Sequence, residues 1–141
     1  MTTDLEVLGQ AIKRAQYRNH RTMDLALQDV GVSLVQWDAL RAIDRMPGAS
    51  GHDLAVATFQ SDQAFGTLAN RLHDRGLIAR TPGRGRRIEH ALTDDGRQVL
   101  HDGHAIAGGV LTELFSSLGE ADRATLLQLL QKSALAARDG A

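Results

Sequence analysis

Apolar side chains recur at helical spacings along most of this chain, which predicts a mainly α-helical protein. The first series comprises Leu5, Leu8, Ile12 and Ala15. A Thr3-x-x-Glu6 pattern at its start has the form of a capping box, so we expect the first helix to begin near Asp4. Gly31 is a natural stop, and the helix should run to about Asp29.

Three more helices are expected in the next part of the chain. The second should follow Ser33 and end at Pro47-Gly48, and a third, short helix should begin at Ser50. The fourth follows the N-cap residue Ser61 and ends at Gly76, because glycine adopts the left-handed conformation that terminates helices. Two helices joined by a short polar turn are typical of a helix-turn-helix, and we expect the third and fourth helices to form one.

The hydrophobic spacing changes after the fourth helix. Residues 77–80 and 87–92 are candidate strands, and the Pro82-Gly83 turn between them, followed by a second glycine, predicts a β-hairpin with a basic tip. A fifth helix should follow the cap Thr93, and a sixth should open at Gly119-Glu120. The predicted fold class is mainly α with a small β-hairpin, in which a winged helix-turn-helix is flanked by N- and C-terminal helices.

The flanking helices carry more apolar side chains than one small helix-turn-helix can cover. We expect their apolar faces to interlock with those of a second copy, which makes the protein a homodimer. Such a two-fold dimer would place two reading helices one DNA turn apart and predicts a pseudo-palindromic site. The apolar segments are 5–30, 99–118 and 121–135. The expected organisation is a single domain, 1–141, with dimerisation helices at 1–30 and 94–141, a winged helix-turn-helix at 33–92 and a wing at about 78–92.

The fifth helix contains three glycines, Gly103, Gly108 and Gly109. Glycines within a helix permit either a kink or the close approach of a second helix. The sequence leaves both alternatives open.

The composition excludes several classes of function. The 141 residues are 43% apolar and 23% charged, which is enough for one domain with a core. Cysteine is absent, which excludes disulfides, cysteine-ligated zinc and thiol catalysis. The first residues lack the pattern of a secretory signal, and no stretch approaches the length of a membrane span. We therefore expect a cytoplasmic protein.

Charge is distributed unevenly along the chain. The net charge is −1, but residues 60–90 contain six arginines against three acids, a local net of +3, while the remainder has ten basic and fourteen acidic residues. A basic segment on an acidic body suits a polyanion such as DNA. A solvated loop in an arginine-rich protein is the alternative.

The fourth helix supplies the candidate DNA-reading side chains. If Phe65, Leu68 and Leu72 turn toward the core, polar groups are left outward, where Gln and Asn amides can bond adenine and Thr can meet thymine. Asp62 suits the helix dipole but would repel phosphate. The hairpin arginines suit backbone phosphates or an adjacent minor groove. The expected DNA-binding residues are Ser61, Gln63, Gly66, Thr67, Asn70, Arg71, Arg84, Arg86 and Arg87.

Other functions have weaker support. The sequence contains neither a Gly-rich phosphate loop nor a nucleophile elbow, so we expect no enzymatic activity and no cofactor. His101 and His104 could share a helix face and ligate a metal, which would indicate a metal-responsive regulator, although exposed histidines are the simpler interpretation and no metal site is assigned. A third possibility is a protein-interaction module whose basic hairpin meets an acidic partner and which is indifferent to duplex sequence.

Four segments, in order and spacing, resemble the MarR family of dimeric winged-helix transcription regulators. Gly31-Val-Ser-Leu-Val-Gln-Trp-Asp-Ala-Leu is similar to the start of the family's second helix. Residues 65–80 resemble its recognition helix and the R-G-L-I-x-R exit into the wing. Leu92-Thr-Asp-Asp-Gly96 is similar to the L-T-x-x-G that starts the fifth helix, and residues 118–132 resemble the closing dimerisation helix.

The resemblance implies a repressor that a small, often aromatic or phenolic, ligand releases from DNA. The ligand would bind between the dimer helices and the DNA-reading lobe, on elements that carry Tyr17, His20, Arg21, Trp37 and Arg41. A single Trp at an apolar helix position is also typical of a core residue. Two departures separate this chain from the family pattern. Arg84-Gly85-Arg86 stands where the wing usually has Asp-x-Arg, and Gly66-Thr67 replaces the commoner Thr-Arg pair, so the family's DNA preference does not transfer.

Overall fold

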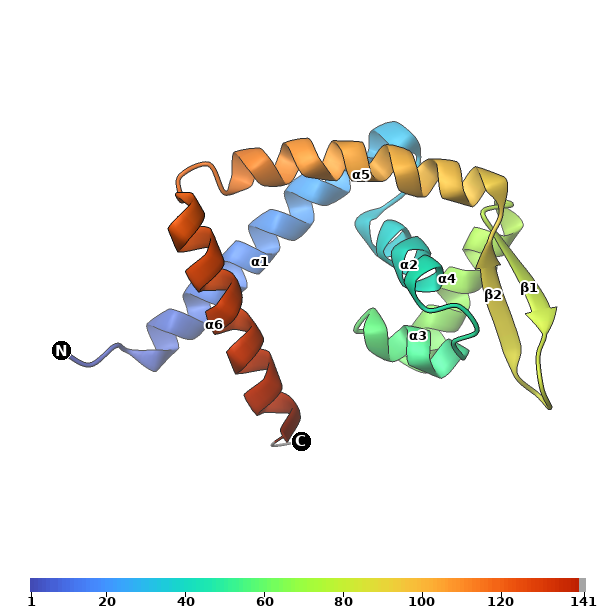
Figure 1. Cartoon of the computed structure of the whole chain (residues 1–141), viewed down its shortest axis with the longest axis horizontal. Helices are drawn as coiled ribbons and strands as arrows, with labels where there is room; N and C mark the ends of the chain where they lie inside the picture. Colours follow the sequence, from blue (N-terminus) through green and yellow to red (C-terminus); the bar gives the residue numbers. More distant parts are fainter. Residues whose placement is uncertain (140–141) are drawn as a thin grey trace.

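The structure is a computed structural model that describes residues 1–139, with side chains described through residue 134. Helices make up most of it, and β1 and β2 form a small antiparallel sheet (Figure 1). In chain order the elements are α1 (Leu5–Leu27), the 3-10 helix η1 (Gln28–Val30), α2 (Leu34–Arg45), α3 (Gly51–Ala57), α4 (Asp62–Asp74), β1 (Ile78–Pro82), β2 (Ile88–Leu92), α5 (Asp94–Leu114) and α6 (Glu120–Asp139). The mainly α fold class with one hairpin is confirmed. Residues 140–141 and the side chain of Leu135, both within the expected C-terminal dimerisation segment, lie outside the described residues.

Side-chain caps begin most helices where the sequence predicts them. Ser33 forms a full capping box at the start of α2, and the hydroxyls of Ser61 and Thr93 accept from first-turn amides of α4 and α5. The first helix differs, because Asp4 is its N-cap and accepts from two backbone amides at 2.9 and 3.3 Å. The capping box expected at Thr3 is therefore wrong. An ionised carboxylate one residue later is a stronger acceptor for these amides than the threonine hydroxyl.

The winged part of the chain surrounds one core. Figure 1 shows α5 along the top of the molecule, with α2 and α3 beneath its right-hand half and the hairpin below its right-hand end. Buried side chains from α2, α3, α4, the hairpin and α5 join in this core, together with those from the C-terminal end of α1. The hairpin pairs Ile78 with Leu92 and Arg80 with His90. This core fixes α4 and the wing on one side of the molecule.

Helices α2 and α5 cross closely at Gly103. The ring of Trp37, 3% exposed, lies against this glycine, and its Nε1 donates to the Leu100 carbonyl at 3.3 Å. A Cβ at position 103 would lie 2.1 Å from Trp37 Nε1, whereas a Cβ at Gly108 or Gly109 would meet nothing within 4 Å. Of the two alternatives left open by the sequence, close crossing is therefore the role of Gly103.

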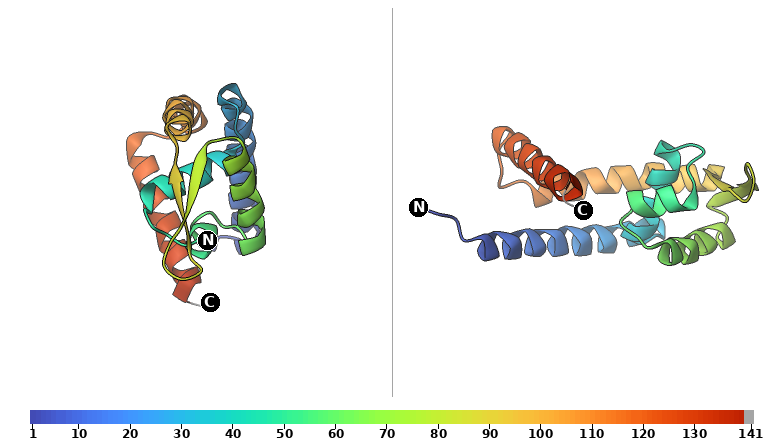
Figure 2. Two further views of the ribbon diagram at one scale, coloured as in Figure 1. Left: turned by 90° about the vertical axis from the view of Figure 1, so that its right-hand side faces the viewer. Right: turned by 90° about the horizontal axis from the view of Figure 1, so that it is seen from below.

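The outer halves of the flanking helices are largely uncovered. Figures 1 and 2 show α1 and α6 extending away from the winged part, and α6 makes no extensive contact with another element in the described range. Their exposed apolar side chains are Leu5, Val7, Leu8, Ile12, Leu126, Leu127, Leu129 and Leu130. Among the helices of residues 1–139, none has the length and apolar character needed to cross a membrane.

Candidate nucleic-acid interface

Helix α4 has one buried face and one exposed face, as its pattern predicts. Phe65, Ala69 and Leu72 are each at most 2% exposed, which anchors the helix on the core. The outward side chains, all exposed, are those of Gln63, Gly66, Thr67, Asn70 and Arg71. A Cβ at Gly66 would meet nothing within 4 Å, so the backbone is open to a large ligand at that point. The helix therefore presents a continuous polar face.

Two hydroxyls of the expected DNA-binding set are engaged within the helix. Ser61 Oγ accepts from the Ala64 amide at 3.0 Å and so caps α4. Thr67 Oγ1 donates to the Gln63 carbonyl at 3.2 Å. In this arrangement Thr67 offers an acceptor and a methyl group to the outside, whereas Ser61 acts on the orientation of the helix.

The wing is basic at its tip and tied to the loop behind it. Arg84, Arg86 and Arg87 are exposed, and Arg87 donates to the carbonyl of Gly48 in the loop between α2 and α3. Neither Arg84 nor Arg86 forms an ion pair within the described residues. Arg87 therefore holds the wing in place, while the other two arginines keep free charges.

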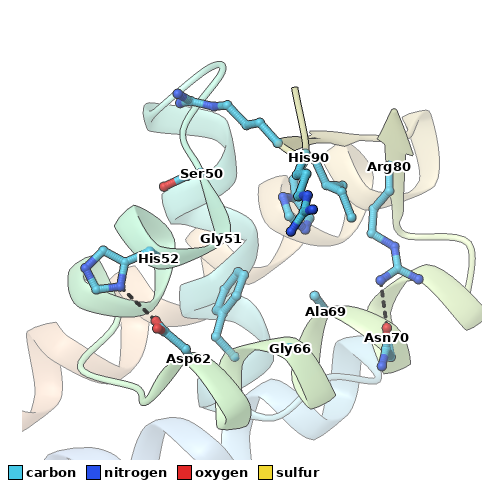
Figure 3. A pocket seen from close by; sticks show the side chains of 13 residues that line it. Ser50, Gly51, His52, Asp62, Gly66, Ala69, Asn70, Arg80 and His90 are labelled. Carbon is cyan, nitrogen blue, oxygen red and sulfur yellow. Dashed lines mark hydrogen bonds and ion pairs between the residues drawn. The ribbon is translucent and has the colours of Figure 1, made fainter. Parts of the chain in front are cut away.

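A furrow of about 510 Å³ separates α4 from the wing (Figure 3). Apolar side chains of both elements line part of it, and polar side chains line the remainder. The lining residues are Ser50, Gly51, His52, Asp62, Phe65, Gly66, Ala69, Asn70, Arg80, Arg86, Arg87, Ile88 and His90. Three arginines therefore face one carboxylate, which makes the furrow attractive to anions.

Arg80, which was not among the DNA-binding residues expected from the sequence, also lies in this furrow. Its Nη1 donates to Asn70 Oδ1 at 2.6 Å (Figure 3), which joins β1 to the outward face of α4. One signal in the sequence could have found it. Alternate residues of a strand share a face, so the apolar Ile78 places Arg80 on the same side of β1, toward the helix.

An ion pair that the sequence pattern did not predict lies at the start of α4. His52 Nδ1 and Asp62 Oδ1 lie 2.9 Å apart and connect the first turns of α3 and α4 (Figure 3). The hydrogen bond to Asp62, together with the charge of that carboxylate, raises the pKa of the exposed His52. The acid that was expected to repel phosphate is therefore compensated when His52 is protonated.

His90 lies at the base of the wing, beside Arg80. Its ring meets Phe65 edge-on, with centroids 6.0 Å apart, and its Nδ1 is buried without a hydrogen-bond partner among the described residues. Burial lowers the pKa of His90, and the charge of Arg80 lowers it further. The imidazole is therefore neutral at pH 7.

Some of the expected ligand-binding residues gather where α2 meets α5. The guanidinium of Arg41 lies 4.9 Å from the centroid of the Trp37 ring, and His104 meets that ring edge-on at 5.1 Å. Arg41 Nη1 is 3.5 Å from Asp38 Oδ1, and its Nε is buried without a partner in the described part of the chain. Burial raises the pKa of Asp38, an effect that the charges of Arg41 and His20 oppose.

The remaining expected ligand-binding residues lie apart from this group. Tyr17 is 63% exposed on α1, and Arg21 is also exposed. Trp37 is a core residue, which is one of the two interpretations that its sequence position allowed. The structure therefore brings Trp37, Arg41 and His20 together and leaves Tyr17 and Arg21 on the surface.

The histidines considered for a metal do not collect further ligands. Within residues 1–139 there is no group of three or more His, Asp or Glu side chains placed to hold a metal ion. His104 packs on Trp37, and His101 is exposed.

Comparison with known proteins agrees with this geometry. A sequence model of the MarR family matches residues 30–88, which span the helix-turn-helix, β1 and the turn of the hairpin up to the first residue of β2. The chain therefore resembles the MarR family across its winged helix-turn-helix. It is 27% identical over 127 residues to the HTH-type transcriptional repressor Rv2887 of Mycobacterium tuberculosis, covering 89% of this chain and 91% of the repressor.

Solved structures of MarR-family proteins share the fold. A regulator from Rhodococcus sp. RHA1 superimposes with a TM-score of 0.86 at 19% identity, covering 95% of this chain and 96% of that one. Rv2887 in complex with salicylic acid superimposes with a TM-score of 0.73 at 25% identity, covering 89% and 94% of the two chains.

The wing lacks the acid of the Asp-x-Arg pattern that is usual in the MarR family, and the structure shows what orients the hairpin. The bond from Arg87 to the Gly48 carbonyl fixes the wing to the α2–α3 loop. Arg80 attaches the base of the wing to α4 through Asn70. Two arginine bonds to neutral acceptors therefore hold the wing.

Proposed function

We propose that this chain is a DNA-binding transcriptional repressor of the MarR family and not an enzyme. It would act as a homodimer on a pseudo-palindromic operator and would be released by a small aromatic ligand. The observation that carries the proposal is the exposed polar face of α4 beside a wing whose arginines keep free charges. In winged helix-turn-helix proteins the second helix enters the major groove, and basic wing residues meet phosphates or the minor groove.

The proposed interface residues divide by role. Gln63, Thr67 and Arg71 would read base edges, and Gly66 would let the backbone of α4 approach the groove. Arg84 and Arg86 would anchor the wing on the DNA backbone. The remaining expected residues would orient the interface rather than contact DNA themselves. Ser61 caps α4, Arg87 bonds the wing to the loop behind it, and Asn70 is bonded to Arg80.

A second copy of the chain would cover the flanking helices. Isolated helices are marginal in water, and α6 exposes Leu127 and Leu130 at 57% and 44% without extensive contact to its own chain in the described range. We assign residues 1–30 and 94–141 to dimerisation and 33–92 to the winged helix-turn-helix. The dimer would present two α4 helices to successive major grooves.

The effector would bind beside Trp37 and Arg41. The buried Nε of Arg41 has no partner among the described residues, and its charge suits the carboxylate of an aromatic acid. Salicylic acid binds the relative Rv2887 in its solved complex. Binding would favour a spacing of the two α4 helices that no longer matches the DNA, which is a shift between populated states.

Titration of the protein into a fluorescent duplex of its own upstream region, beside a scrambled duplex, tests the proposal. We expect tight, salt-dependent binding to one duplex and weak binding to the other. If neither is preferred, selection from random duplexes replaces the upstream region. Failure to enrich any sequence at low salt would refute sequence-specific DNA binding and favour a protein-interaction module.

A further inference from the structure

Arg80 carries a charge that no carboxylate neutralises within the described residues. Its partner, Asn70 Oδ1 at 2.6 Å, belongs to a neutral amide. The one carboxylate that lines the furrow, Asp62, is engaged by His52 at 2.9 Å. The furrow therefore contains a guanidinium with full positive charge.

The bond also fixes which way the Asn70 amide points. A guanidinium has only donors, so the amide must turn its oxygen to Arg80 and its NH₂ group away. Bidentate reading of adenine needs that oxygen to accept from adenine N6 while the NH₂ group donates to N7. Because the oxygen already takes a short, charge-assisted bond, Asn70 is not free to read adenine as its sequence position suggests.

We propose that Arg80 binds a DNA backbone phosphate in the furrow and that Asn70 positions Arg80 rather than reading a base. The inference rests on the proposed DNA-binding function. If α4 enters the major groove and the wing reaches the adjacent minor groove, the sugar-phosphate strand between those grooves crosses the furrow. Arg80 uses one of its five N–H donors on Asn70, and the others remain for phosphate oxygens.

Because the Asn70 side chain is neutral, a substitution that adds a negative charge there tests the inference directly. Asn70→Asp keeps the size of the side chain and exchanges the amide for a carboxylate, which would form an ion pair with Arg80. The variant retains the link between β1 and α4, so it should fold at least as well as the wild type. It nevertheless cancels the charge that attracts phosphate, and so separates the folding role of the link from binding.

The experiment measures the affinity of the full chain for its selected operator and for single-base variants of that operator, over a range of salt concentrations. Arg80→Ala and Asn70→Asp should each weaken binding about tenfold at low salt, by a similar factor for every duplex. The slope of log affinity against log salt should fall by about 1.8 for the dimer, because each of its two protomers loses one phosphate contact worth about 0.9. Arg45→Ala, at an exposed position of α2 outside the proposed DNA-binding and dimerisation residues, controls for the change in net charge and should have little effect.

An NMR titration of the histidines gives a second readout that does not involve DNA. Removing the charge of Arg80 should raise the pKa of His90 in Arg80→Ala, because that charge is one cause of the lowered value. An unchanged His90 would show that the charge is already neutralised, and would overturn the inference.

Two binding results would also overturn the inference while leaving DNA binding intact. One is an Asn70→Asp variant that changes the preferred base at one position, for example toward cytosine, whose N4 donates to carboxylates. The other is an Arg80→Ala variant with wild-type affinity and salt slope. If the wild-type chain itself prefers no duplex, the proposed function fails, and this inference fails with it.

Discussion

At the residue scale, the electrostatics of the interface depend on which charged groups have charged partners. Arg80 and Arg87 bond to neutral oxygens, and Arg84 and Arg86 have no ion pair in the described part of the chain, so the wing keeps its positive charge. Asp62 at the start of α4 is the exception, because His52 compensates it only when protonated. DNA affinity should therefore respond to pH through this pair.

The His52–Asp62 pair predicts weaker DNA binding as pH rises from below 6.5, the ordinary histidine pKa, through the raised pKa of His52. The pKa of His52 is raised by Asp62, so the compensating charge is fully present below the ordinary histidine pKa of 6.5 and is lost as pH passes the folded value. The charge of Asp53 also raises the pKa of His52. Affinity for the operator, measured by anisotropy across this range, checks the prediction.

Removal of the histidine provides the control. The variant His52→Gln should show a flatter pH dependence than the wild type, whereas His101→Gln, an exposed position on α5, should retain the wild-type dependence. A wild-type curve in His52→Gln would mean that another group causes the effect.

The position of Arg41 beside Trp37 leads to a prediction for the binding of an aromatic acid. Salicylate should quench the fluorescence of Trp37, the single tryptophan of the chain, because the guanidinium that would hold its carboxylate lies 4.9 Å from that ring. Arg41→Gln should weaken the salicylate response about tenfold or more, since a charged hydrogen bond is lost. Arg45→Gln, an exposed arginine of the same helix, is the matched control. Equal responses from both variants would place the ligand elsewhere.

At the element scale, local signals predicted where helices begin, but contacts decided how they pack. Ser33, Ser61 and Thr93 cap helices as expected, because capping depends on residues three positions away. The bond between Asn70 and Arg80 depends on a chain reversal, which residue spacing alone does not reveal. The backbone of Phe59, between α3 and α4, was also not predictable from the sequence. No neighbouring residue indicates the φ of 58° that it adopts.

The crossing of α2 and α5 gives a stability prediction. Gly103→Ala should lower the free energy of unfolding by about 1–3 kcal/mol, because the new Cβ would overlap the buried Trp37 ring. Gly66→Ala, with open space around its Cβ, should raise the free energy of unfolding by about 1 kcal/mol, because alanine has a higher helix propensity than glycine. Urea unfolding monitored by circular dichroism measures both. A neutral Gly103→Ala would show that the two helices can separate without cost.

At the scale of the whole molecule, the flanking helices expose apolar faces that a second copy of the chain would cover. Their exposed leucines were predicted from the sequence to form a dimer seam, and in the structure these side chains remain uncovered by their own chain. Burying a leucine contributes about 1.5–3 kcal/mol, so several together would hold a stable dimer. The two halves of the DNA interface would then be fixed relative to each other.

A charge in this seam should separate the dimer. Leu130→Glu is expected to sediment as a monomer at concentrations where the wild type is a dimer, because a buried carboxylate without a partner is costly. Its operator affinity should fall in parallel, since one half-site alone is bound. Val56→Glu places the same charge at an exposed apolar position of α3 and should leave the dimer intact. A dimeric Leu130→Glu would place the seam elsewhere.

In the proposed complex, two α4 helices held by the dimer read two half-sites one DNA turn apart. The most direct test compares affinity for the selected operator with affinity for the same operator lengthened by about five base pairs, half a turn, at its centre. The insertion turns the half-sites to opposite faces of the duplex, so we predict a loss of about 100-fold or more, to the level of non-specific DNA. Equal affinity for the two duplexes would contradict the account.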